Sequence, residues 1–165
     1  MFATVSREDL LPGLAKVART GWRVMDDAVL LKRWYKSYHG NRAAFAGLLD
    51  YEIAVNGRGI YDLDLEVSGV ERVPALLRRG AAFAWAALHT ACRDVPRSRL
   101  AAYISAAPVY ATPEVYTGNV TFCALRPGLP PYVGQDADHI VVALFSEDCA
   151  QPLPGTPRGW FHFAR

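Results

Sequence analysis

The chain has 165 residues, of which 52% are hydrophobic and 12% aromatic, so it carries enough apolar material for a buried core and is not a disordered chain. Its formal net charge is +2, and both signs are spread along the sequence, which does not favour a nucleic-acid binder. No apolar run approaches the length of about 18 residues that a membrane helix needs, and no secretory leader pattern opens the chain. We expect a single globular domain over residues 1–165, located in the cytoplasm.

The first predicted helices are bounded by capping residues. Ser6 suits a helix N-cap, and Pro12 implies either a helix that begins there or a kink; Gly21 ends the helix in both cases. A second helix is predicted to open at Asp26-Asp27 and to stop at Gly40, with an apolar stripe on one side. Its other side carries the basic residues Lys32, Arg33 and Lys36.

The stretch from Leu49 to Val67 is predicted to be a β-hairpin. Apolar and acidic residues alternate along both arms, and Gly57-Arg58-Gly59 between them suits a three-residue hairpin loop. Matching the apolar faces sets Glu52 opposite Asp64 and Asp50 opposite Glu66. The predicted binding site is the resulting acidic face, which consists of Asp50, Glu52, Asp62, Asp64 and Glu66.

Like charges directly opposite each other on a hairpin destabilise it by a few tenths to about 1 kcal/mol per pair, so the predicted acidic face requires compensation. Four sources are open: screening by water and salt, the basic helix around Lys32, a partner rich in Lys and Arg, or a divalent metal ion.

The remaining chain is predicted to hold one long helix followed by strands. Pro74 suits the first turn of a helix that runs to about Arg93, with a bend at Gly80, and its apolar composition predicts a central core position. His89 and Cys92 share one face of it; a hydrogen-bonded core histidine is favoured over a nucleophile–base pair. The strands are predicted at Leu100–Ala106, Val120–Leu125, His139–Phe145 and Trp160–Phe163.

These elements predict an α+β fold. With the hairpin they give a mostly antiparallel sheet of about six strands, packed against three or four helices in a single layer. The three cysteines show no CxxC spacing, which predicts free thiols rather than a disulfide framework.

A metal site is the alternative use of the acidic residues. Asp62 and Asp64 would lie about 7 Å apart on one strand face, and Glu52 from the neighbouring arm would complete a site for Mg²⁺ or Mn²⁺. The segment Ile60–Leu65 resembles the first metal motif of the archaeo-eukaryotic primase–polymerase family, in which a helix and then a strand with serine follow; Ser105 matches that serine. Pro108, Val109 and Tyr110 stand where that family carries a histidine. A second carboxylate–histidine cluster is Asp136-Ala137-Asp138-His139.

Three classes of function follow from these patterns. The first is a non-catalytic interaction or assembly module whose acidic hairpin face binds a basic protein or peptide, with no cofactor. The second is Mg- or Mn-dependent phosphoryl or nucleotidyl transfer at Asp62, Asp64 and Glu52. The third is a small-molecule enzyme or carrier with an aromatic-lined pocket drawn from Tyr103, Tyr110, Tyr116 or Trp160.

Overall fold

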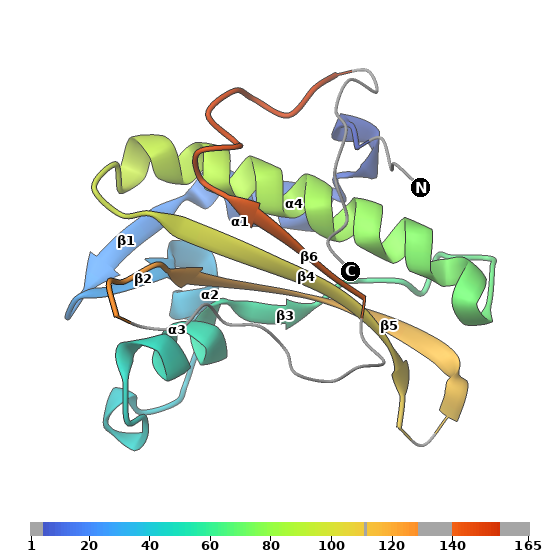
Figure 1. Cartoon of the computed structure of the whole chain (residues 1–165), viewed down its shortest axis with the longest axis horizontal. Helices are drawn as coiled ribbons and strands as arrows, with labels where there is room; N and C mark the ends of the chain where they lie inside the picture. Colours follow the sequence, from blue (N-terminus) through green and yellow to red (C-terminus); the bar gives the residue numbers. More distant parts are fainter. Residues whose placement is uncertain (1–4, 111, 129–139, 156–165) are drawn as a thin grey trace.

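The structure is a computed structural model that describes residues 5–110, 112–128 and 140–155 (Figure 1). Within these ranges it has four α-helices and six strands in two antiparallel sheets, which confirms the predicted α+β class and antiparallel pairing. The predicted single sheet is instead one sheet of two strands and one of four, and three of the six strands are ones that the sequence predicted. The helices are α1 (Pro12–Thr20), α2 (Lys32–Lys36), α3 (Leu48–Asn56) and α4 (Val73–Asp94). The strands are β1 (Trp22–Met25), β2 (Ala28–Leu31), β3 (Gly57–Gly59), β4 (Leu100–Val109), β5 (Thr112–Ala124) and β6 (Ile140–Phe145). Short 3-10 helices cover Arg7–Asp9, Arg42–Ala44 and Gly69–Arg72.

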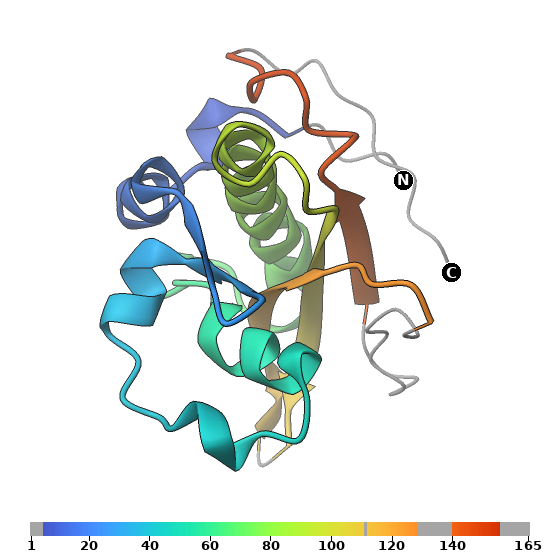
Figure 2. The same cartoon turned by 90° about the vertical axis from the view of Figure 1, so that its left-hand side faces the viewer.

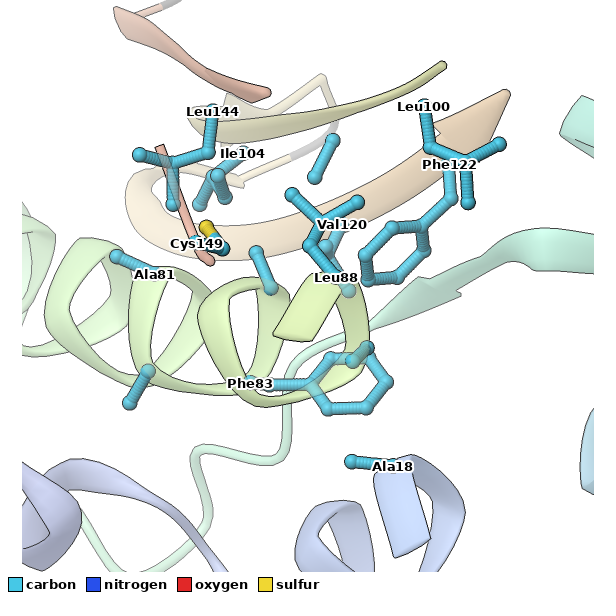
Figure 3. Close-up of a cluster of buried hydrophobic side chains, with 14 of the residues drawn as sticks. Ala18, Ala81, Phe83, Leu88, Leu100, Ile104, Val120, Phe122, Leu144 and Cys149 are labelled. Atoms are coloured by element: carbon cyan, nitrogen blue, oxygen red, sulfur yellow. The ribbon is translucent and has the colours of Figure 1, made fainter. Parts of the chain in front are cut away.

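The main sheet has the strand order β3-β5-β4-β6, and α4 lies along one of its faces (Figures 1 and 2). The core forms between α4 and this face, as the apolar composition of the helix predicts. Figure 3 shows the apolar side chains of α4 and of the sheet meeting there, and the rings of Phe83 and Phe122 pack edge to face at 5.4 Å. The labelled sheet residues on this face are Leu100, Ile104, Val120, Phe122 and Leu144.

The start of the first helix follows one of the two predicted alternatives. Ser6 caps the 3-10 helix Arg7–Asp9, accepting a hydrogen bond from the N–H of Glu8, and α1 begins separately at Pro12. Gly21 ends α1, with its N–H donating to the carbonyl of Ala18.

The prediction of a helix that opens at Asp26-Asp27 is wrong. Asp26 and Asp27 have φ values of 49° and 64°, and they form the tight turn between β1 and β2. Two central residues with positive φ are the signature of a type I′ hairpin turn, which aspartate tolerates better than most residues. Strand β2 is buried along its whole length, and only the five residues of α2 are helical. A short apolar run gives the same pattern in a buried strand and in a helix, which explains the error.

The prediction of a β-hairpin over Leu49–Val67 is also wrong. Its first arm is the helix α3, and its loop Gly57–Gly59 is a strand that pairs with β5. The supposed second arm has no regular secondary structure between Ile60 and Ser68. The residues that α3 buries are Tyr51, Glu52, Val55 and Asn56, a stripe with helical rather than alternating spacing.

The predicted strands at Leu100–Ala106, Val120–Leu125 and His139–Phe145 correspond to β4, β5 and β6. The single layer of helices is not confirmed, because Leu49 of α3 packs against Ala101, Tyr103 and Cys123 on the second face of the sheet. The predicted strand Trp160–Phe163 and the cluster Asp136–His139 lie outside the described residues. No helix of the described ranges is both long and apolar enough to cross a bilayer.

Candidate functional site

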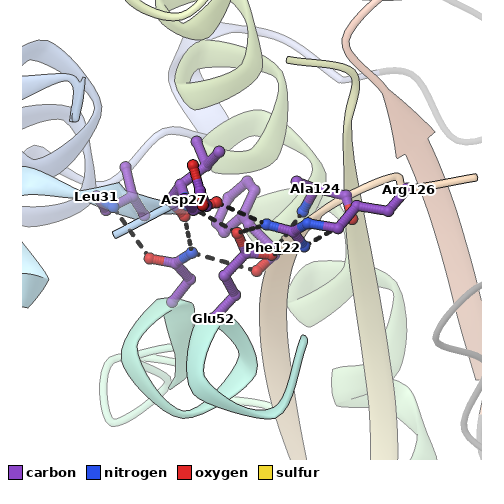
Figure 4. Close-up of polar contacts among 8 residues, drawn as sticks. Asp27, Leu31, Glu52, Phe122, Ala124 and Arg126 are labelled. Atoms are coloured by element: carbon purple, nitrogen blue, oxygen red, sulfur yellow. Dashed lines mark hydrogen bonds and ion pairs between the residues drawn. The ribbon is translucent and has the colours of Figure 1, made fainter. Parts of the chain in front are cut away.

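Glu52, a residue of the predicted acidic face, is a fully buried side chain that joins the two sheets (Figure 4). Its Oε1 accepts hydrogen bonds from the N–H of Val29 in β2 at 2.7 Å and from Nη2 of Arg126 at 2.6 Å. Its Oε2 accepts from the N–H of Ala124 in β5 and from Nη1 of Arg126, both at 2.9 Å. The carboxylate is thus paired with a cation and fully hydrogen-bonded, which is the arrangement that a buried charge requires.

Asn56, one helical turn after Glu52, completes this connection. Its Oδ1 accepts from the N–H of Leu31 at 3.0 Å, and its Nδ2 donates to the carbonyls of Val29 at 2.8 Å and Phe122 at 3.3 Å. Two side chains of α3 therefore satisfy backbone groups of β2 and β5 that do not pair with each other. Hydrogen bonding to Glu52 raises the pKa of Arg126, and burial, followed by the nearby Glu52 charge, raises the pKa of Cys123 to about 11. We assign this cluster a structural role.

Asp62 and Asp64 turn toward two arginines of the following helical segment. Nη2 of Arg72 lies 3.0 Å from Oδ2 of Asp62 and donates to the carbonyl of the same residue at 2.7 Å. Arg79 binds both carboxylate oxygens of Asp64, at 2.7 and 2.6 Å, and donates to the carbonyl of Tyr61 at 2.9 Å. The Arg79 hydrogen bonds hold the pKa of Asp64 below its ordinary value. Each arginine contacts both a carboxylate and a backbone carbonyl, so the pair fixes the course of the segment from β3 to α4.

Several apolar side chains of this segment point into solvent. Of the nine large hydrophobic side chains that are exposed in the described ranges, four lie between residues 61 and 70. We call these four the apolar loop surface: Tyr61 (56% exposed), Leu63 (82%), Val67 (42%) and Val70 (64%). Leu65 lies between Leu63 and Val67 in the same every-second-residue series, but it packs against the core.

Acidic residues accompany the apolar loop surface. Glu66 and Glu71 are exposed within the same segment. Glu114 at the start of β5 is exposed too, and its carbonyl lies beside Gly69. None of the three forms an ion pair with a described residue.

The five residues of the predicted acidic face are therefore distributed over three environments. Asp50 is exposed in the first turn of α3, Glu52 is buried between the sheets, and Asp62 and Asp64 are paired with Arg72 and Arg79. Glu66 is exposed in the segment that the arginines fix, and it forms no ion pair with a described residue. The basic helix around Lys32 was the predicted internal source of neutralising charge, but the arginines that neutralise Asp62 and Asp64 come from the region of α4.

The geometry does not bring the predicted metal ligands together. The placement of Glu52 next to Asp64 depended on the hairpin, and each of the three carboxylates is engaged by an arginine. Across residues 5–110, 112–128 and 140–155, no group of three or more His, Cys, Asp or Glu side chains has the arrangement to hold a metal ion. The resemblance to the first primase–polymerase motif also loses its basis, because Asp62 and Asp64 lie outside any strand.

His89 and Cys92 do not face each other as a nucleophile and a base. Nδ1 of His89 lies 3.1 Å from the carbonyl of Cys149, and Sγ of Cys92 donates to the carbonyls of Leu88 and Ser146 at 3.4 Å. Both side chains fasten the segment after β6 onto α4, which agrees with the favoured structural interpretation of His89.

The tyrosines of the predicted aromatic pocket do not share one site. Tyr103 lies on the second face of the sheet with Ala101 and Cys123, whereas Tyr116 packs against the core on the α4 face. Tyr110 is fully exposed at the end of β4, and Trp160 lies outside the described residues.

The chain matches no protein-family model, no curated protein and no solved structure. The candidate site therefore depends on geometry alone. The sequence did not predict the apolar loop surface. Apolar and acidic residues alternate in Tyr61–Val67, and this pattern is typical of a strand that buries its apolar side. One sequence feature could have indicated the ion pairs of Asp62 and Asp64, namely the seven-residue spacing of Arg72 and Arg79. Residues seven apart lie on one face of a helix, so the two arginines can each pair with one of the aspartates.

Proposed function

We propose that this protein is a non-catalytic interaction module whose apolar loop surface docks onto a partner protein. The observation that carries the proposal is the engagement of both aspartates of this segment, the half-buried Asp62 and the exposed Asp64, by arginines. Their pairing with Arg72 and Arg79 holds Leu63 and its neighbours in water instead of in the core.

The energetics of association favour such a surface. Removing apolar area from water contributes roughly 25 cal/mol per Å², which makes exposed Leu, Val and Tyr side chains the main source of binding energy. Association normally also costs the entropy of ordering a loop. Here the arginine contacts at Asp62 and Asp64 supply that order before the partner arrives, so less of the binding energy is lost.

The acidic neighbours indicate the chemistry of the partner. Glu66, Glu71 and Glu114 are exposed and lack ion pairs with described residues. Complementary charge sets orientation and association rate at an interface. We therefore propose a basic protein or peptide that presents apolar residues flanked by Lys and Arg. The three free cysteines are compatible with a reducing compartment, and we propose the cytoplasm.

Selection from a displayed library of random short peptides tests the proposal. The full chain is the bait, and the double variant Leu63→Ser with Val70→Ser is the comparison. We expect selected peptides to combine Leu, Ile, Phe or Trp with Lys or Arg, and to bind the double variant at least about tenfold more weakly, as loss of central apolar contacts predicts.

Val24→Ser is the matched control. Val24 is 53% exposed, but it lies on β1, at the end of the molecule opposite the start of α4 (Figure 1). Peptide affinity should be unchanged in this variant. Selected peptides that bind the Leu63/Val70 double variant as tightly as the natural chain, or that carry acidic instead of basic residues, would refute the proposal.

A further inference from the structure

Helices α1 and α2 carry four exposed cations in two pairs. Lys16 and Arg19 lie three residues apart on α1, and Arg33 and Lys36 lie three residues apart on α2. Side chains at this spacing are neighbours on one face of a helix. In α1 this face is opposite the buried Val17 and Ala18, so it looks away from the core.

The two helices meet end to start, which brings the two pairs onto one side of the molecule. The N–H of Lys32, the first residue of α2, donates to the carbonyl of Gly21, which ends α1, at 2.9 Å. Figure 2 shows α1 and α2 one above the other to the left of α4, and the buried Trp34 of α2 packs against Phe122 of β5. We call Lys16, Arg19, Arg33 and Lys36 the α1–α2 basic surface.

No acidic residue of the described ranges forms an ion pair with these four cations. Asp94, which lies beside the junction of the helices, is already engaged: it accepts from the N–H of Trp22 at 2.9 Å and pairs with Arg93 at 3.0 Å and with Lys32 at 3.8 Å. Its charge is therefore shared among other groups.

Of the other acidic residues near in sequence, Asp9 pairs with Arg78 and Glu8 is exposed just before α1, while Asp26 and Asp27 lie in the turn at the far end of the β1–β2 hairpin. A strand rises about 3.3 Å per residue, so the four residues of β1 place the turn about 13 Å away. This exceeds the Debye length of about 8 Å at physiological ionic strength. Within the described residues, the four cations of the α1–α2 basic surface thus keep their charges without an ion-pair partner.

We infer that the α1–α2 basic surface binds an acidic segment of another protein, at a site separate from the apolar loop surface. A helical segment with carboxylates three or four residues apart repeats the spacing of the cation pairs, and the guanidinium groups of Arg19 and Arg33 can each bind a carboxylate with two hydrogen bonds.

The aromatic residues of α2 favour an acidic polypeptide over a single-stranded nucleic acid. Binding of single strands depends on exposed aromatic rings on which bases stack. Trp34 is buried, and the Tyr35 ring is covered by the guanidinium of Arg23, whose Cζ lies 5.1 Å from the ring centroid. The net charge of +2 is also small for a protein that must neutralise many phosphates.

Fluorescence anisotropy with a labelled helical peptide that carries glutamates at three- and four-residue spacing tests the inference. The full chain should bind this peptide with an affinity that falls as salt is raised. The double variant Arg19→Glu with Arg33→Glu should bind it at least about tenfold more weakly, because two attractive contacts become repulsive. The matched control is Arg97→Glu with Arg99→Glu, which changes net charge equally in the connection between α4 and β4, on the sheet side of α4 (Figure 2).

The control pair should retain the affinity of the natural chain, and so should the Leu63/Val70 double variant, which separates this inference from the proposed function. Absence of peptide binding to the natural chain would overturn it, as would an equal loss in the Arg97/Arg99 control. A DNA duplex that binds more tightly than the peptide, and is displaced by the Arg19/Arg33 substitutions, would assign the surface to nucleic acid instead and overturn the choice of partner.

Discussion

At Gly80, helix α4 comes so close to the sheet that no larger residue fits. A Cβ atom there would lie 2.4 Å from Cγ2 of Ile104 and 2.7 Å from Cδ1 of Ile60. Cγ2 of Ile104 can move aside only if the whole β-branched side chain rotates about Cα–Cβ, and the fully buried surroundings of Ile104 oppose that rotation. The sequence suggested a bend at this glycine, but its observed role is close packing within a continuous helix.

We predict that Gly80→Ala lowers the free energy of unfolding. Overpacking a core costs about 1–3 kcal/mol, which exceeds the gain of about 1 kcal/mol from the better helix propensity of alanine. Urea unfolding followed by circular dichroism measures the difference.

Gly13→Ala is the control for helix propensity, because a Cβ at Gly13 in α1 meets nothing within 4 Å. This variant should be as stable as the natural chain or more stable, by up to about 1 kcal/mol. The packing explanation fails if the two substitutions change stability in the same direction.

The segment Ile60–Ser68 between β3 and the 3-10 helix Gly69–Arg72 acts as a structural element although it lacks regular secondary structure. Arg72 and Arg79 give it fixed geometry, and the hydrogen bond from the N–H of Leu65 to the carbonyl of Asp62 closes a turn within it. Its order depends on charge, which makes it sensitive to pH.

We predict that acid weakens this element through Asp64. The Arg79 hydrogen bonds lower the pKa of Asp64 in the folded chain, whereas an unfolded aspartate titrates near pH 3.9. A group whose folded pKa is depressed stabilises the fold above its unfolded pKa, and this contribution is lost as pH falls through the folded value. The natural chain should therefore be more stable than Asp64→Asn at neutral pH, and the difference should shrink below about pH 4.

Denaturant unfolding of both chains between neutral and acidic pH measures this effect, and Arg79→Gln supplies the control background. Without the guanidinium, Asp64→Asn should change stability little, and the pH dependence of the difference should disappear. A difference that persists unchanged in acid, or in the Arg79→Gln background, would contradict the assignment.

At the scale of the whole molecule, α3 is what holds the β1–β2 sheet against the four-stranded sheet through polar contacts. Glu52 and Asn56 reach β2 on one side and β5 on the other, and Arg126 closes the cluster from the end of β5 (Figure 4). These contacts join segments that are distant in sequence, so their loss affects both sheets together.

We predict that Glu52→Gln destabilises the chain by about 3 kcal/mol. Removing one member of a buried ion pair costs about 3–5 kcal/mol, and the lower end applies because the Arg126 side chain is 21% exposed and regains some hydration. Guanidinium unfolding gives the free energy, and hydrogen exchange should show faster exchange at the amides of Val29 and Ala124.

Asp50→Asn is the matched control, since it removes an exposed carboxylate two residues away on the same helix. Exposed substitutions of this kind change stability by less than about 0.5 kcal/mol. If Glu52→Gln falls within the same range, the cluster does not connect the sheets as the contacts indicate.

The sequence alone determined the elements whose signals are local. Pro12 and Gly21 mark the ends of α1, Pro74 lies in the first turn of α4, and the apolar run of α4 predicts its burial. Proline, glycine and continuous apolar stretches act through the backbone and through area removed from water, so they have the same meaning in most surroundings.

Only the tertiary structure decided what the acidic residues do. Alternating patterns at Leu49–Val55 and Tyr61–Val67 fit a strand as well as the observed helix and loop, and the choice depends on cations far along the chain. Arg126, 74 residues away, pairs with Glu52 in the interior, while Arg79 binds the exposed Asp64 at the surface and Leu63 stays in solvent. The energy of an ion pair depends on the distance between the two charges in space, whereas a sequence pattern gives only their separation along the chain. The ion-pair partners of these acidic residues are therefore known only once the fold is known.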